Sequence, residues 1–146
     1  GMGRLVEYLK ENTEDIKKNK PTFYFIHHMS PHWPYITKSD CSYKRYIGKN
    51  NLEGYEAAYL CTLKRIENTI NYLFKTDPNS FVVFQGDHNW EMSYTSEKIY
   101  GDRKKIFNLL KIDKKCNRKE NINLNNVNTV RLILSCITGN DPVFLK

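Results

Sequence analysis

The sequence lacks the features that mark several common classes of protein. No apolar run approaches the roughly 20 residues that a membrane-spanning helix needs, and no signal peptide is visible at the start. The four cysteines form no C-x-x-C pair, which excludes a zinc ribbon and a thioredoxin motif. Internal repeats, low-complexity linkers and a second-domain boundary are also missing, so the pattern predicts a single domain and indicates no compartment.

The composition supports a folded core and a basic surface. Of the 146 residues, 40% are hydrophobic and 13% aromatic, which excludes a disordered polypeptide. The net charge of +7 would attract anionic substrates in a general way. The lysines are spread along the chain among Asn, Glu and Asp, which favours a solvated surface over a nucleic-acid interface. Cys61 and Cys136 fall in helical patterns and are predicted to be buried thiols, with a disulfide left open.

The stretch Phe81–His88 carries the strongest candidate for a site. Its first four residues are large and apolar, and the run is too short for a helix, so it predicts a buried strand. Gly86 frees the backbone to turn, and Asp87 and His88 follow where the strand should end. A carboxylate beside an imidazole can hold a metal ion, but the same pair is common as a turn carboxylate and a surface histidine. Both interpretations stay open at this point.

The segments before this stretch predict a helix, a strand, a loop and a second helix. An amphipathic helix is expected over about 4–18, and the aromatic run in Thr22–His28 predicts a central strand buried on both faces. A stiff loop with prolines and histidines then leads to a helix over Leu52–Phe74. Its expected apolar stripe consists of Tyr55, Tyr59, Leu63, Ile66, Ile70 and Leu73.

Strand, loop, helix and strand in this order form a crossover unit, whose two strands should be parallel. The expected fold class is therefore α/β, with a mainly parallel sheet and flanking helices. Parallel strands end at the same edge of a sheet, so His27 and His32 should meet Asp87 and His88 there. Further along, residues 105–112 fit either a strand or a short helix. Asn128 is expected to cap a last helix, which Gly139 ends.

Two histidine-bearing blocks resemble a known family. The first block begins at His27, contains Pro31 and His32, and ends at Tyr35, and the second is Phe81–His88. Both blocks are similar to the later half of sulfatase-like enzymes of the alkaline phosphatase superfamily. The helix between them lies where the family has one. Weaker similarities, further along, are Asp102-Arg103, Ile106-Phe107-Asn108, Asn128-Thr129-Val130-Arg131 and Gly139-Asn140-Asp141.

The resemblance implies an alkaline-phosphatase-like fold and transfer of a phosphate or sulfate ester group, assisted by divalent metal. By match, Asp87 and His88 would be metal ligands. His32 would be catalytic, in contact with the transferred group or a second metal, and His27 is a weaker substrate-binding candidate. The metal would be zinc, manganese, calcium or magnesium.

The sequence also departs from the family pattern. Asn89 stands where the motif usually continues with glycine, and the half of the enzyme that bears the nucleophile has no counterpart. The expectation is thus one partial domain over residues 1–146, inactive alone and with weak or absent metal binding, since zinc sites need three or four ligands. An exposed sheet edge further predicts a homo-oligomer, or pairing with a missing N-terminal half.

Two other interpretations stay open beside the incomplete ester hydrolase or transferase. One is a non-catalytic derivative that binds an anionic ligand or a partner protein. The other is a nucleic-acid-binding module, which the scattered charge disfavours.

Overall fold

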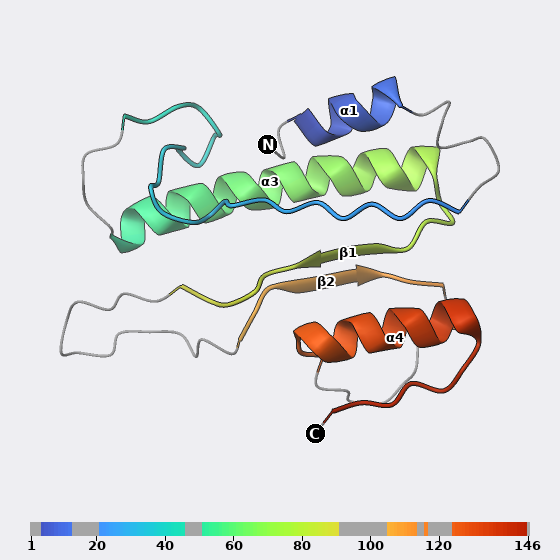
Figure 1. The fold of residues 1–146 in the computed structure, drawn as a ribbon. Helices are drawn as coiled ribbons and strands as arrows, with labels where there is room; N and C mark the ends of the chain where they lie inside the picture. The colour runs from blue at the N-terminus through green and yellow to red at the C-terminus, as the bar shows by residue number, and fades with distance from the viewer. Residues whose placement is uncertain are drawn as a thin grey trace. The chain divides into compact units, whose positions relative to one another are not determined.

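The computed structural model describes residues 4–12, 21–45, 51–90, 105–113, 116 and 124–145. The chain divides into two compact units, Gly1–Thr76 and Asp77–Lys146. The elements follow in the order α1, α3, β1, β2 and α4 (Figure 1). Among the described residues, no helix is both long and apolar enough to cross a membrane.

The first unit is built on α3, Leu52–Thr76, against which α1, Leu5–Glu11, packs (Figure 1). The predicted long helix is confirmed, but its buried face differs from the expected stripe. The buried positions are Gly54, Ala58, Cys61, Thr62, Ile66 and Thr69. Most of these side chains are small, because the loop before the helix packs closely on this face. The first helix ends earlier than expected, with Asn12 as its C-cap, and the remainder of its predicted range lies outside the described residues.

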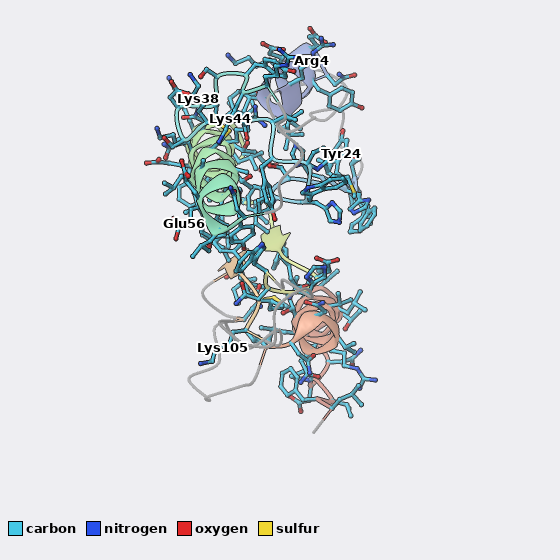
Figure 2. All side chains as sticks on the ribbon, turned by 90° about the vertical axis from the view of Figure 1, so that its left-hand side faces the viewer. Arg4, Tyr24, Lys38, Lys44, Glu56 and Lys105 are labelled. Atoms are coloured by element: carbon cyan, nitrogen blue, oxygen red, sulfur yellow. A yellow bond between two sulfur atoms is a disulfide. The ribbon has the colours of Figure 1, made fainter. Side chains whose placement is uncertain are left out.

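The loop over residues 30–45 is fastened to α3 at several points. Ser30 and Thr62 share a hydrogen bond of 2.8 Å between their hydroxyls. Tyr35 is buried over Gly54, where an added Cβ would lie only 2.7 Å from the Tyr35 ring. An isolated bridge between Thr37 and Tyr43 folds the loop back on itself, which brings the labelled Lys38 and Lys44 near each other in Figure 2.

The prediction of a strand over Thr22–His28 is wrong for the described residues. The segment is extended but belongs to no sheet, and the side chains of Phe23 and Phe25 are 87% and 82% exposed. A buried strand needs neighbouring strands for its backbone and layers to cover its side chains. Within the described part of the chain, no backbone hydrogen bond involves residues 23–27. The crossover unit is therefore not formed by the described residues.

The second unit contains a two-stranded sheet of β1, Val82–Gln85, and β2, Asn108–Lys111. The strand predicted at Phe81–Phe84 is confirmed to within one residue, and the ambiguous segment over 105–112 contributes a strand. The pairing is antiparallel, with Val82 opposite Lys111 and Gln85 opposite Asn108, so the expected parallel arrangement is not what these residues show. Both strands are only partly buried, because two strands and one helix cannot cover both faces of a sheet.

The last helix, α4, runs over Asn126–Thr138. Its N-cap is Asn125 and not the expected Asn128, since the Asn125 side chain accepts a hydrogen bond from the Asn128 amide. Asn128 is instead buried, and its side chain bonds the backbone of Leu145 in both directions, at 2.9 and 2.8 Å. The predicted end of the helix is confirmed, because Gly139 is the C-cap with φ of 73° in the left-handed region.

All four cysteines form disulfides, which corrects the expectation of buried thiols at Cys61 and Cys136. Cys41 bonds Cys61 within the first unit, and Cys116 bonds Cys136 within the second. The Cα atoms are 4.9 and 5.4 Å apart, within the span that a disulfide bridges. Each pair joins a residue outside the α-helices to a helix residue 20 positions away, so the pairing depends on tertiary packing.

Candidate functional site

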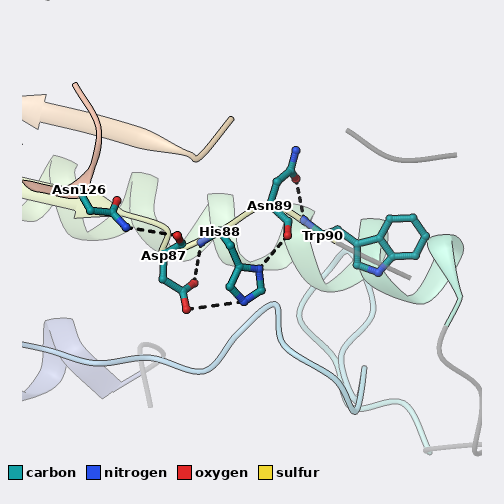
Figure 3. Close-up of polar contacts among 5 residues, drawn as sticks. All are labelled: Asp87, His88, Asn89, Trp90 and Asn126. Carbon is teal, nitrogen blue, oxygen red and sulfur yellow. Dashed lines mark hydrogen bonds and ion pairs between the residues drawn. The ribbon is translucent and has the colours of Figure 1, made fainter. Parts of the chain in front are cut away.

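The candidate site begins where β1 ends. The amide of Gly86 donates to the carbonyl of Phe107 at 2.9 Å, which continues the antiparallel pairing one residue past the strand. Asp87 and His88 follow directly in an exposed bend, and the His88 amide donates to Asp87 Oδ1 at 3.0 Å (Figure 3). The sequence therefore predicted correctly that a carboxylate and an imidazole leave the end of this strand side by side.

The ring of His88 is turned so that one nitrogen faces Asp87. His88 Nδ1 lies 2.8 Å from the backbone oxygen of Asn89, as Figure 3 shows. A carbonyl oxygen can only accept, so Nδ1 carries the hydrogen and, in the neutral ring, Nε2 keeps its lone pair. Nε2 lies 3.7 Å from Asp87 Oδ2. The two acceptor atoms face each other at a distance that one metal cation can bridge.

The chemistry of this donor pair fits a divalent metal, but the number of donors does not complete a site. Carboxylate oxygen and neutral imidazole are ordinary ligands for zinc and manganese, and the hydrogen bond from Nδ1 to a carbonyl is typical of metal-binding histidines. The side chains of His88 and Asp87 are 42% and 85% exposed, so a cation can reach them. Within the described ranges, no group of three or more His, Cys, Asp or Glu side chains could hold a metal ion.

The other two candidates, His27 and His32, lie in the first unit. Both are exposed, and His32 Nδ1 is 2.5 Å from the backbone oxygen of Trp33. The His32 amide donates to the carbonyl of Met29 at 2.6 Å, which closes a turn that contains Ser30 and Pro31. His27 and His32 belong to one unit and Asp87 and His88 to the other, so their meeting at a common rim stays a prediction.

His28, which the sequence did not assign to the site, bonds the loop that follows it. Its Nδ1 accepts a hydrogen bond from the Ser30 amide at 2.9 Å, so the ring stays half-buried beside the loop. Burial lowers the pKa of His28, and the positive charge of Arg65 lowers it further. This shift favours the neutral ring of His28. His27 faces solvent, as the alternation along an extended segment predicts.

Sequence reasoning missed the side chains that support the end of β1. Asn126 Nδ2 donates to the backbone oxygen of Asp87 at 3.2 Å, and Gln85 and Asn108 both bond Thr129. Asn126 lies in an asparagine-rich stretch, where nothing in the sequence distinguishes it from its neighbours. The one available signal was its place just before a helical pattern, where polar side chains often serve the backbone.

Comparison with known protein families identifies a match. A family model described as Sulfatase matches residues 2–123, which is most of the chain. Neither the comparison with curated proteins nor the comparison with solved structures found a match.

Proposed function

Because the chain belongs to the sulfatase family, we propose that it is a partial domain of a metal-dependent phosphate or sulfate ester hydrolase or transferase. Membership carries the expectation of an alkaline-phosphatase-like α/β fold and of ester substrates. All 146 residues form the partial domain in this proposal, and the missing part supplies the nucleophile and the remaining metal ligands. The observation that carries it is the Asp87–His88 pair, whose acceptor atoms face each other beyond the end of β1.

Each candidate residue has a distinct role in this proposal. Asp87 and His88 hold a divalent cation through Oδ2 and Nε2, and the Asn89 carbonyl keeps the His88 ring in the binding tautomer. His32 contacts the transferred group or a second metal, and His27 assists in binding the anionic substrate. The cation, when bound, supplies positive charge that stabilises the group being transferred. Two ligands bind metal weakly, so this chain alone is expected to show no turnover.

The metal assignment is tested by titration of the chain with Mn²⁺ while paramagnetic broadening of histidine ring signals is followed by nuclear magnetic resonance. We expect broadening at His88 at weak affinity, and its loss in Asp87→Ala. Asp77→Ala is the matched control, because Asp77 lies at the opposite end of β1, and this variant should bind as the original chain does. A tight, stoichiometric site that survives Asp87→Ala would contradict the assignment.

The catalytic assignment is tested with a generic phosphate or sulfate ester in the presence of zinc or manganese. The expected result is no turnover above the metal alone. If turnover is found, His32→Ala and Asp87→Ala must each lower it for the assignment to stand. An unchanged rate in both variants would remove these residues from the site.

Partner binding is proposed from the exposed aromatic segment Phe23–Ile26, whose extended backbone pairs with no other strand among the described residues. Another copy of the chain or the missing N-terminal half would pair with it, as unpaired strands pair readily. Light scattering should detect self-association that falls in Phe23→Ser/Phe25→Ser. Phe74→Ser is the control, because Phe74 is a 52% exposed aromatic side chain on α3. A clean monomer at high concentration would count against self-association.

The second candidate function, a non-catalytic derivative that binds an anionic ligand or a partner protein, is favoured by the same segment and by the charge of +7. It predicts that the chain binds such a partner while Asp87→Ala and His32→Ala leave the affinity unchanged. Loss of affinity for this partner in either variant would contradict the non-catalytic function and support the ester-transfer site.

A further inference from the structure

A buried threonine of α4 joins the ends of both strands in the second unit. Gln85 and Asn108 lie opposite each other in the sheet, and the side-chain amides of both donate to Thr129 Oγ1, at 2.8 and 2.9 Å. The Asn108 amide also donates to the Leu124 carbonyl at 3.1 Å. Thr129 is fully buried. Hydrogen bonds from both strands to a buried hydroxyl hold the first turn of α4 against the end of the sheet from which Asp87 emerges.

Asn126 extends this connection to the candidate ligands. It precedes Thr129 by three residues in the same helix, so the two side chains lie on the same side of its first turn. Asn126 Nδ2 donates to the Asp87 carbonyl at 3.2 Å, which Figure 3 shows. The other bonds of Asp87 and His88 are to each other and to Asn89, and bonds between chain neighbours cannot anchor a loop to the fold.

We propose that Asn126 is a positioning residue, which ties the Asp87 backbone to α4 and so keeps the Asp87 carboxylate facing His88 Nε2. Among the described residues, Asn126 is the one residue outside 87–89 whose side chain bonds either ligand candidate. The functional meaning of this tether rests on the proposed metal role of Asp87 and His88, whereas the tether itself does not. Without it, two exposed side chains on a free bend would spend less time in the arrangement that binds a cation.

The test compares Asn126→Ala with Asn128→Ala, a matched control two residues along the same helix. Asn128 bonds the Leu145 backbone, and in the described part of the chain no hydrogen bond joins it to Asp87. We expect Asn126→Ala to speed hydrogen exchange at the His88 amide about twofold to tenfold, the range that loss of one hydrogen bond allows. Asn128→Ala should leave this amide unchanged and lower the melting temperature instead. Asn126→Gln, which keeps the amide donor, should restore slower exchange at His88.

The same variants are titrated with Mn²⁺, with broadening of the His88 ring signals as the readout. The Mn²⁺ concentration for half-maximal broadening should rise about twofold to tenfold in Asn126→Ala and stay unchanged in Asn128→Ala. If the original chain shows no broadening at His88, the proposed metal site is rejected. The hydrogen-exchange comparison still tests whether Asn126 holds the Asp87 backbone. Exchange at His88 that is unchanged in Asn126→Ala, or equally faster in Asn128→Ala, overturns the proposal.

Discussion

Removal of the Cys41–Cys61 disulfide should cost the first unit a large part of its stability. The bond closes a loop between residues 20 positions apart and fastens the loop over residues 30–45 to α3. In the chain-entropy description, a loop of this length contributes about 3 kcal/mol by restricting the unfolded chain. That corresponds to roughly a 150-fold change in the folding equilibrium, since about 1.4 kcal/mol is a factor of ten.

The perturbation is the double variant Cys41→Ala/Cys61→Ala, which leaves no unpaired thiol from this bond. Cys61 is completely buried, so alanine there keeps most of the packing and the lost cross-link dominates. Cys41 has φ of 70°, a left-handed backbone that strains alanine by roughly 1 kcal/mol relative to glycine. Cys41→Gly/Cys61→Ala should therefore recover about 1 kcal/mol of the loss.

The assay is urea unfolding without reductant, combined with hydrogen exchange to locate the loss. For a loss of about 3 kcal/mol, the midpoint should fall by about 1–3 M urea. The control is Cys116→Ala/Cys136→Ala, which opens a loop of the same sequence separation in the other unit. Exchange should quicken in α3 for the first variant and in α4 for the control. A loss below about 1 kcal/mol would refute the chain-entropy argument, and faster exchange in α4 alone would refute the assignment of the bond to the first unit.

Four further substitutions each probe a single position. The pKa of His28 is lowered mainly by burial, so protonation of this ring opposes folding. The urea midpoint should therefore decline as the pH falls below about 6.5, and it should decline less with pH in His28→Gln. Asn125→Ala removes the N-cap of α4 and should cost about 1 kcal/mol in thermal unfolding, whereas an unchanged melting temperature would reject the cap. Gly54→Ala places a Cβ 2.7 Å from Tyr35 and should cost about 1–3 kcal/mol by overpacking. In Gly139→Ala the added Cβ meets no atom within 4 Å, so this variant should lose only about 1 kcal/mol, from its left-handed backbone. A larger loss of stability for Gly139→Ala than for Gly54→Ala in urea unfolding would contradict both estimates.

Much of the local structure follows from short stretches of the sequence. The period of apolar residues predicted α3 almost to its ends, and Gly139 ends α4 where expected. The apolar run before Gly86 predicted β1, and the position of Asp87 and His88 after it. These features depend on backbone preferences and on residues a few positions apart, which the sequence displays directly.

Which segments come together was decided by tertiary structure. Residues 22–28 have the composition of a central strand, yet a strand exists only where another backbone accepts its hydrogen bonds. The antiparallel pairing of β1 with β2, the small-residue face of α3, and the two disulfides likewise depend on distant partners. The Asn126 tether is another such case, because its acceptor is a backbone carbonyl 39 residues away and any residue type offers one. Chain neighbours thus determined the elements, and packing between remote segments determined their pairing and the support of the candidate site.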